Sequence, residues 1–97
     1  MKLVIEKGTS KFKRYKAIFY DDKGKKLRTV QFGDNRYEAY IDHKDKERRS
    51  RYLDRHRKNE NWNNYLSAGA LSRWILWGAS TSIKENIKKY KTRFKLT

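Results

Sequence analysis

The sequence predicts one small α+β domain, in which a short antiparallel sheet is followed by three or four helices. Apolar residues alternate with polar ones within residues 1–33, whereas from residue 37 to residue 95 they recur at intervals of three and four. No repeat or low-complexity linker divides the 97 residues, and a second domain would be too small to bury a core. We therefore expect residues 1–97 to fold as a single unit.

The first third of the chain carries the pattern of a β-hairpin. Apolar and polar side chains alternate over residues 14–20, and the Asp-Asp-Lys-Gly segment at 21–24 supplies a turn whose glycine can take a positive φ. The chain returns through residues 27–32, and Gly-Asp-Asn at 33–35 ends that strand. Residues 3–5 are the candidate third strand, because a lone hairpin is only marginally stable in water.

The period becomes helical after the hairpin. Residues 37–41 are expected to open a short helix, and residues 43–58 to form a longer and densely charged one. Turn-forming residues at 59–64 interrupt the pattern. A third helix is expected over residues 67–77, with a serine as its N-cap and Gly78 as its stop.

The last predicted helix begins at Ser82, which precedes Glu85 by three residues, the spacing of a capping box. Apolar residues then recur at steps of four, three and four, at Ile83, Ile87, Tyr90 and Phe94. This stripe predicts a helix that packs on the domain and keeps its basic residues in water.

The segment 67–78 is the most apolar in the chain, and Arg73 is its only charged residue. Its composition predicts the central core helix. The alternative is a hydrophobic docking surface for partner proteins, formed by Leu71, Trp74 and Trp77, because two tryptophans are hard to cover fully in so small a domain.

The net charge of +15 comes from 26 Lys and Arg against 11 Asp and Glu. Charge on this scale repels itself, and a bound polyanion would relieve the repulsion. We therefore expect the chain to bind nucleic acid, with double-stranded DNA first, or another polyanion. The alternative is that the charge confers only solubility. Basic residues occur in every predicted element, which favours sequence-independent contacts to phosphates over the reading of bases.

The predicted helix at 43–58 supplies most of the candidate nucleic-acid-binding residues. On an unbroken helix, positions 44, 48, 51, 55 and 58 share one face, from which arginine and lysine side chains can reach successive phosphates. Together with a neighbour on the helix and two hairpin residues, the candidate set is Lys44, Arg48, Arg49, Arg51, Arg55, Lys58, Lys16 and Arg28. The alternative is a solvated face laced with weak ion pairs between Asp45 and Arg49, Glu47 and Arg51, and Asp54 and Lys58.

Aromatic residues of the hairpin offer a second mode of nucleic-acid binding. Tyr15, Phe19, Tyr20 and Phe32 could stack on unpaired bases, although hairpin aromatics more often pack beneath helices. The sequence does not decide between these roles for Arg36 and Tyr37, which follow the hairpin.

The sequence carries no motif of a known catalytic site. It contains no cysteine, no glycine-rich phosphate loop and no nucleophile motif. His43 and His56, its only histidines, would point in different directions on one helix, which argues against a two-histidine nuclease site. We expect no enzymatic activity, no metal and no cofactor, with a small nuclease as the remaining alternative.

The compartment is suggested by what the sequence lacks. No apolar run approaches the roughly 18 residues of a membrane span. The apolar stretch at residues 3–5 is too short for a secretory signal. Because cysteine is missing as well, we expect a reducing, cytosol-like compartment or a particle assembled there.

The string AGALSRWILW at residues 68–77 is the most distinctive in the chain. With the strings at 15–21, 32–33, 43–49, 51–56, 60–62 and 90–94, it resembles an uncharacterised family of small basic proteins encoded by nucleocytoplasmic large DNA viruses, the algal and amoebal giant viruses. The family has no established function, so the resemblance transfers no site residue.

The resemblance implies a context for the expected binding. It implies a large double-stranded DNA genome and a location in the virion, in the cytoplasmic factory of the host cell or in its nucleus. The leading hypothesis is then a DNA-binding protein of low sequence specificity, associated with genome packaging. The alternative is a minor capsid or core protein, which would bind acidic proteins or an internal membrane and dock through the helix of Leu71, Trp74 and Trp77.

Overall fold

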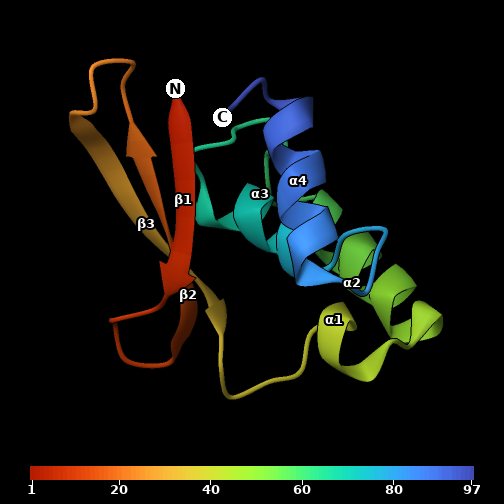
Figure 1. Ribbon diagram of the computed structural model, residues 1–97. Helices are drawn as coiled ribbons and strands as arrows, with labels where there is room; N and C mark the ends of the chain where they lie inside the picture. The colour runs from red at the N-terminus through yellow and green to blue at the C-terminus, as the bar shows by residue number, and fades with distance from the viewer.

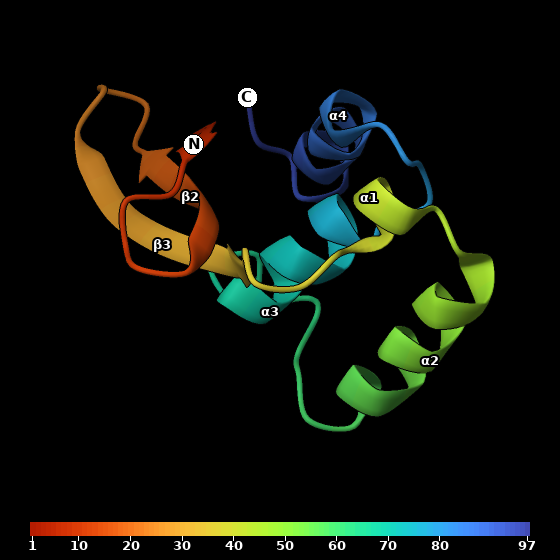
Figure 2. The ribbon, with the colours of Figure 1, turned by 90° about the horizontal axis from the view of Figure 1, so that it is seen from below.

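All of the helices lie on one face of a three-stranded antiparallel sheet in the computed structural model, which describes residues 1–97 (Figures 1 and 2). The elements in chain order are β1 (Lys2–Lys7), β2 (Lys13–Tyr20), β3 (Lys26–Asp34), α1 (Tyr40–His43), α2 (Lys46–Arg57), α3 (Ala68–Leu71), the π-helix η1 (Ser72–Leu76) and α4 (Ile83–Arg93). The predicted α+β class is confirmed, with strands first and helices after.

The sheet is a meander in the order β1-β2-β3, so both the hairpin and the third strand are confirmed. In its register Leu3 lies opposite Phe19, and Tyr15 lies opposite Phe32. Leu3, Phe19 and Phe32 are fully buried beneath the helices. At the turn between β2 and β3, the Asp21 carboxylate accepts hydrogen bonds from two backbone N–H groups, as the turn chemistry of the sequence predicts.

The predicted third helix begins at its serine cap, where the Ser67 hydroxyl accepts a hydrogen bond from the Ala70 N–H at 3.1 Å. After α3 the helix widens into η1, and the Trp77 N–H reaches back five residues to the Ser72 carbonyl. Leu71 is fully buried, so the segment is the expected core helix. Leu71 therefore offers no surface to a docking partner, whereas Trp74 and Trp77 are half-buried.

Buried Asn86 fastens the end of η1 to α4. Its Nδ2 donates to the carbonyls of Ile75 at 2.9 Å and Ser80 at 2.7 Å, and its Oδ1 accepts from the Ser80 N–H. Gly78 lies against this amide, and a Cβ there would lie 2.3 Å from the Trp74 carbonyl oxygen. The glycine predicted as a helix stop is thus also required by close packing.

The predicted stripe of α4 packs on the core as expected. Tyr90 is buried and donates a 2.6 Å hydrogen bond from its hydroxyl to the Tyr65 carbonyl, and burial raises the pKa of this hydroxyl. Ile83, Ile87 and Phe94 pack around the same core. No helix in the structure combines the length and the apolar character needed to cross a bilayer.

The predicted short helix and long helix are confirmed as α1 and α2, but their boundaries differ, because α1 extends to His43 and the long helix begins at Lys46. Lys44 ends α1 with a φ of 58°, and the Asp45 carboxylate caps α2 by accepting from the N–H groups of Glu47 and Arg48. Asp42 in α1 is held by Arg14 of β2, a contact between residues far apart in the chain. Such a tertiary restraint cannot be read from local periodicity.

Candidate nucleic-acid interface

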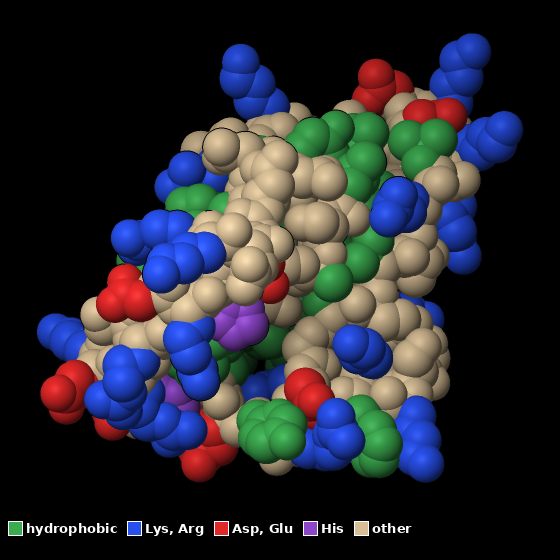
Figure 3. All heavy atoms as spheres, turned by 180° about the vertical axis from the view of Figure 1, so that it is seen from behind, with side chains coloured by type: hydrophobic (Ala, Val, Ile, Leu, Met, Phe, Trp, Pro, Cys, Tyr) green, Lys and Arg blue, Asp and Glu red, His purple; other side chains and the backbone are tan.

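A cleft of about 590 Å³ lies between α2 and the end of the sheet where β3 leaves it. α2 contributes one wall, β2 and β3 contribute another, and residues of α3 and η1 lie between them. Figure 3 shows this hollow from behind, with Lys and Arg side chains gathered on its α2 side. Its volume is typical of ligand pockets, which span about 300–1,000 Å³.

Three predicted site residues of α2, Arg48, Arg51 and Arg55, line this cleft. Their spacing of three and four places them on one helix face, as expected. All three are exposed, and none has a carboxylate within 4.0 Å. Three unpaired guanidinium groups therefore face a single concave surface.

The ion pairs that would have neutralised this helix do not form. Asp45 is engaged as the cap of α2, and Asp54 lies 4.0 Å from Arg57 instead of pairing with Lys58. Glu47 makes no ion pair at all. The alternative of a helix laced with the three predicted pairs is therefore wrong.

The sheet wall of the cleft adds Lys13, which the candidate set omitted, and Arg14. Arg14 Nη2 donates to Asp42 Oδ1 at 3.0 Å, and the second oxygen of this carboxylate accepts from the Ala39 N–H at 2.8 Å. The hydrogen bond from Arg14 holds the pKa of Asp42 below its ordinary value. This pair joins β2 to α1 and thereby fixes the segment that leads to the arginine wall.

A row of four aromatic rings, of which the first three are stacked, begins at the cleft. The ring centroids of His56 and Tyr52 lie 4.1 Å apart, those of Tyr52 and Trp77 lie 4.0 Å apart, and those of Trp77 and His43 lie 5.2 Å apart. Burial raises the pKa of the Tyr52 hydroxyl. The two histidines stand at opposite ends of this row, so the structure does not bring them together as a nuclease site would require. No three or more His, Asp and Glu side chains are grouped so as to hold a metal ion.

An aromatic cluster, made of Phe12, Arg36 and Tyr37, lies where the chain leaves the sheet. The guanidinium carbon of Arg36 is 4.3 Å from the ring centroid of Phe12 and 5.8 Å from that of Tyr37. Phe12 is 41% exposed and Tyr37 is 70% exposed. Tyr37 also lines the cleft, so this cluster borders the same hollow as the arginines.

The hairpin aromatics named in the sequence analysis have a different role. Phe19 and Phe32 are fully buried, and the ring of Tyr15 packs 6.0 Å from that of Phe32. The packing interpretation is confirmed for these three residues. Sequence reasoning left Arg36 and Tyr37 undecided and did not single out Phe12.

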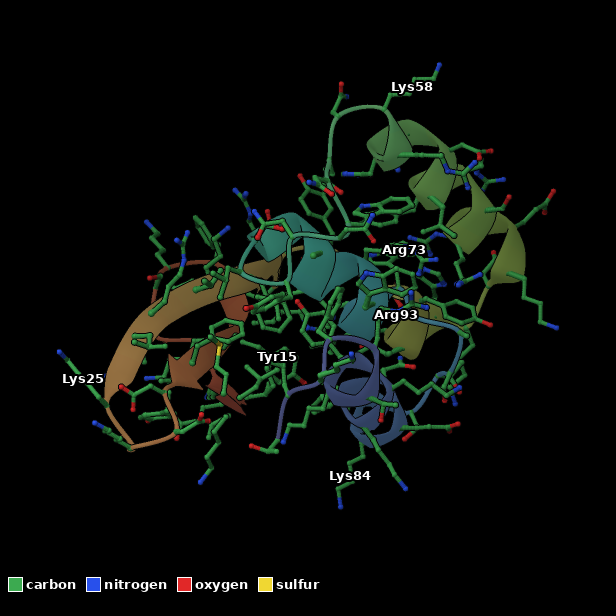
Figure 4. All side chains as sticks on the ribbon, turned by 90° about the horizontal axis from the view of Figure 1, so that it is seen from above. Tyr15, Lys25, Lys58, Arg73, Lys84 and Arg93 are labelled. Carbon is green, nitrogen blue, oxygen red and sulfur yellow. The ribbon has the colours of Figure 1, made fainter.

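The remaining five predicted site residues lie outside the cleft. Lys44 precedes α2 in the left-handed link, so its expected place on the shared face is wrong. Lys58 caps the C-terminus of α2, and its side chain points away from the body of the molecule (Figure 4). Lys16 pairs with a carboxylate on β1, since its Nζ lies 3.7 Å from Glu6 Oε1. Arg28 is exposed on β3, where it lies opposite Phe19.

Arg49, the last of the five, belongs to a second group of arginines. Its Nε donates to the carbonyls of Trp77 and Gly78, both at 3.1 Å, and Arg73 Nη1 donates to the same Trp77 oxygen at 3.3 Å. Arg49 therefore joins α2 to η1 instead of facing the cleft. Two guanidinium groups thus donate to one carbonyl oxygen. Arg73 is the only charged residue of its own segment, but the fold brings Arg49 beside it.

The second arginine group is Arg49, Arg73 and Arg93, which line a shallow pocket beside Trp74, and none of the three lies within 4.0 Å of a carboxylate. The guanidinium carbons of Arg73 and Arg93 lie 4.0 Å and 3.7 Å from its ring centroid. Burial, with added repulsion from the other two arginines, lowers the pKa of Arg73 to about 10. Figure 4 shows Arg73 and Arg93 between α2 and α4.

Residues 3–56 match the model of a family of unknown function, DUF5754. The chain belongs to this family. The matched region contains β2, β3, α1 and nearly all of β1 and α2, and thus includes both the cleft arginines and the aromatic cluster. No curated protein and no solved structure matches the chain.

Proposed function

We propose that this DUF5754 protein binds nucleic acid without sequence specificity and that the α2 wall of the cleft contacts the phosphates. The observation that carries the proposal is the convergence of Arg48, Arg51 and Arg55 on one cleft with no carboxylate partner. Guanidinium groups suit phosphate because their planar donors can form two parallel hydrogen bonds.

The overall charge supports the same ligand. Only five of the 26 Lys and Arg side chains lie within 4.0 Å of a carboxylate. Most of the net charge of +15 is therefore free to attract a polyanion and to displace the cations condensed on it. Binding of this kind weakens steeply as the salt concentration rises.

The biological setting of the proposal comes from the sequence resemblance alone. Under it, the ligand is the genome of a large DNA virus, and the protein acts in the virion, in the viral factory or in the nucleus. Neither the fold nor the family match bears on this setting. The competing virion-assembly role has less support, because Leu71 of its expected docking helix is buried.

The test is a charge-reversal variant with a matched control. The variant Arg48→Glu, Arg51→Glu, Arg55→Glu removes the three cleft arginines, and the control Lys23→Glu, Lys25→Glu, Lys26→Glu makes the same change in net charge. The control residues are exposed at the far end of the hairpin, and Figure 4 places Lys25 there, away from α2. Affinity for a labelled oligonucleotide is measured by fluorescence anisotropy over a salt series.

We expect the cleft variant to lose about a hundredfold or more in affinity, since a hydrogen bond between charged groups contributes about 1.5–3 kcal/mol. The slope of log affinity against log salt should also become shallower by about 2–3, because each lost phosphate contact removes about 0.7–0.9 of slope. The control should retain most of its affinity. Equal losses in both variants, with both folded by circular dichroism, would mean that charge alone governs binding and would contradict the cleft assignment.

A further inference from the structure

Phe12 has a strained backbone conformation and lies outside the hydrophobic core. Its φ of 65° lies in the left-handed region, which bulky side chains rarely adopt. Its carbonyl accepts a 2.9 Å hydrogen bond from the Asn35 N–H, so the turn holds it in this conformation. The ring is 41% exposed and takes no part in the hydrophobic core. A strained residue whose side chain faces solvent suggests a role in binding.

Arg36 is held beside this ring by a carboxylate. Asp34 accepts from Arg36 Nε at 3.0 Å and from Arg36 Nη2 at 2.7 Å. These hydrogen bonds lower the pKa of Asp34 to about 2, so the clamp is charged at neutral pH. The guanidinium carbon is thereby kept 4.3 Å from the Phe12 ring centroid. The arrangement presents flat π-faces without requiring the groups to become ordered on binding.

Exposed aromatic surface is concentrated at this place. Among the large apolar side chains only Phe12, Leu27 and Tyr37 are strongly exposed, and two of these three belong to the aromatic cluster. Tyr37 lines the cleft together with Lys13, Arg48 and Arg51. The exposed ring of Tyr37 therefore borders the same cleft as the unpaired cationic groups, and Arg36 lies near the rings of both Tyr37 and Phe12.

A ligand that fits both the cationic groups and the aromatic rings beside the cleft has an anionic backbone and flat faces that are free to stack. Unpaired nucleic acid has both features, and proteins that bind it combine a basic groove with aromatic side chains. A duplex offers only the first feature, because its bases are stacked on one another.

We infer that the strand held in the cleft is unpaired and that its bases stack on Phe12, Arg36 and Tyr37, an inference that rests on the proposed function. The expectation of duplex DNA drawn from the sequence would then be replaced by a preference for single strands. Arg48, Arg51 and Arg55 hold phosphates on one wall while bases turn toward the aromatic cluster. The contact tolerates any sequence, since every base has a π-face.

The experiment compares three probes: a single-stranded oligothymidylate, an abasic oligonucleotide of the same length, and a duplex of that length. Each probe is titrated against the wild-type protein, the double variant Phe12→Asn, Tyr37→Ser, and the control Leu27→Ser. Asparagine tolerates the left-handed backbone at position 12 better than most residues do. Leu27 supplies the control because it is exposed on β3 outside the cleft.

Wild type and the Leu27→Ser control should bind the thymidine strand at least about tenfold more tightly than the abasic strand, because one stacked base contributes that much. The double variant should bind both strands equally, at the affinity of the abasic one. Tyr37→Phe should behave as wild type. Equal wild-type affinity for thymidine and abasic strands, or tighter binding of the duplex, would overturn the stacking inference.

Two further readouts separate this inference from the proposal on which it rests. If the abasic strand binds and the triple glutamate variant abolishes that binding, phosphate contact stands even where stacking fails. If no probe binds wild type, the proposed function itself fails. Photocrosslinking of wild type to an iodouridine strand needs no variant: adducts at Phe12 or Tyr37 support stacking, and adducts confined to other residues overturn it.

Discussion

The rings of Tyr52 and Trp77 stack in parallel, with their centroids 4.0 Å apart and 1° between their planes. Tyr52 lies midway along α2, and Trp77 follows η1 directly. The contact therefore attaches the arginine-bearing helix to the core. Arg49, also on α2, donates to the Trp77 carbonyl, so both attachments end on the same residue. The position of the cleft wall depends on this junction.

Replacing Tyr52 by alanine should detach α2 and lower the free energy of unfolding by about 3–5 kcal/mol, as the loss of a buried aromatic ring usually does. Urea unfolding followed by circular dichroism measures the change. Tyr52→Phe keeps the ring and should cost far less, and Lys58→Ala on the exposed end of the helix should stay within about 0.5 kcal/mol of wild type. A loss below about 1 kcal/mol for Tyr52→Ala would show that other contacts hold the helix.

Asp42 should make stability depend on pH in the acid range. Its hydrogen bond from Arg14 lowers its pKa in the folded state below the ordinary value of 3.8. The unfolded state then binds more protons in this range, so the contribution is present above about pH 4 and is lost as the pH falls through the lowered pKa. Asp42→Asn should therefore be less stable than wild type at pH 7.

The measurement is the free energy of unfolding in urea between about pH 2 and pH 7. The curve of Asp42→Asn should be shallower below pH 4 than that of wild type, and the two should approach each other at the acid end. Glu47→Gln, which removes a carboxylate without an ion pair, is the control variant. Parallel curves for wild type and Asp42→Asn would show that the Arg14 contact does not favour the folded state.

Asn86 should be among the polar residues most sensitive to replacement. Its amide satisfies two carbonyls and one N–H at the junction of η1 and α4, and its side chain is almost fully buried. Asn86→Leu leaves these backbone groups without partners, each of which costs about 1–3 kcal/mol. We expect a loss of at least about 3 kcal/mol in thermal or urea unfolding. Lys84→Leu, on the exposed side of the same helix, should change stability little.

Local sequence signals predicted most of the elements but not how they meet. The strands, the turn at Asp21 and the serine caps of α3 and α4 follow from alternation and from side chains that bind nearby backbone. The exact place of the break at Lys44 was missed, because Asp45 was assigned to an ion pair with Arg49 and not to the N-cap of α2. Asp42, just before the break, is held by Arg14, which lies 28 residues earlier in the chain.

In the candidate site, too, the sequence predicted contacts between residues close in the chain and missed contacts between residues far apart. The shared face of Arg48, Arg51 and Arg55 follows from helical spacing. The aromatic cluster does not, since Phe12 and Arg36 are far apart in the chain. The pairing of Lys13 with Asp34 in the sheet brings them together. A correct register for the predicted hairpin would have placed Phe12 beside residues 35–37, and this was the one available clue.

The arginines around Trp74 should make stability rise with salt. Arg73 and Arg93 both lie against this ring, no carboxylate offsets them, and their repulsion is screened as the Debye length falls from about 30 Å at 0.01 M to about 3 Å at 1 M salt. Arg93→Gln removes one charge from the group, whereas Lys25→Gln removes one from the distant hairpin tip. The melting temperature measured over this salt range should therefore rise less in Arg93→Gln than in Lys25→Gln or wild type. Equal slopes in the two variants would mean that the net charge of the chain, and not this group, sets the response to salt.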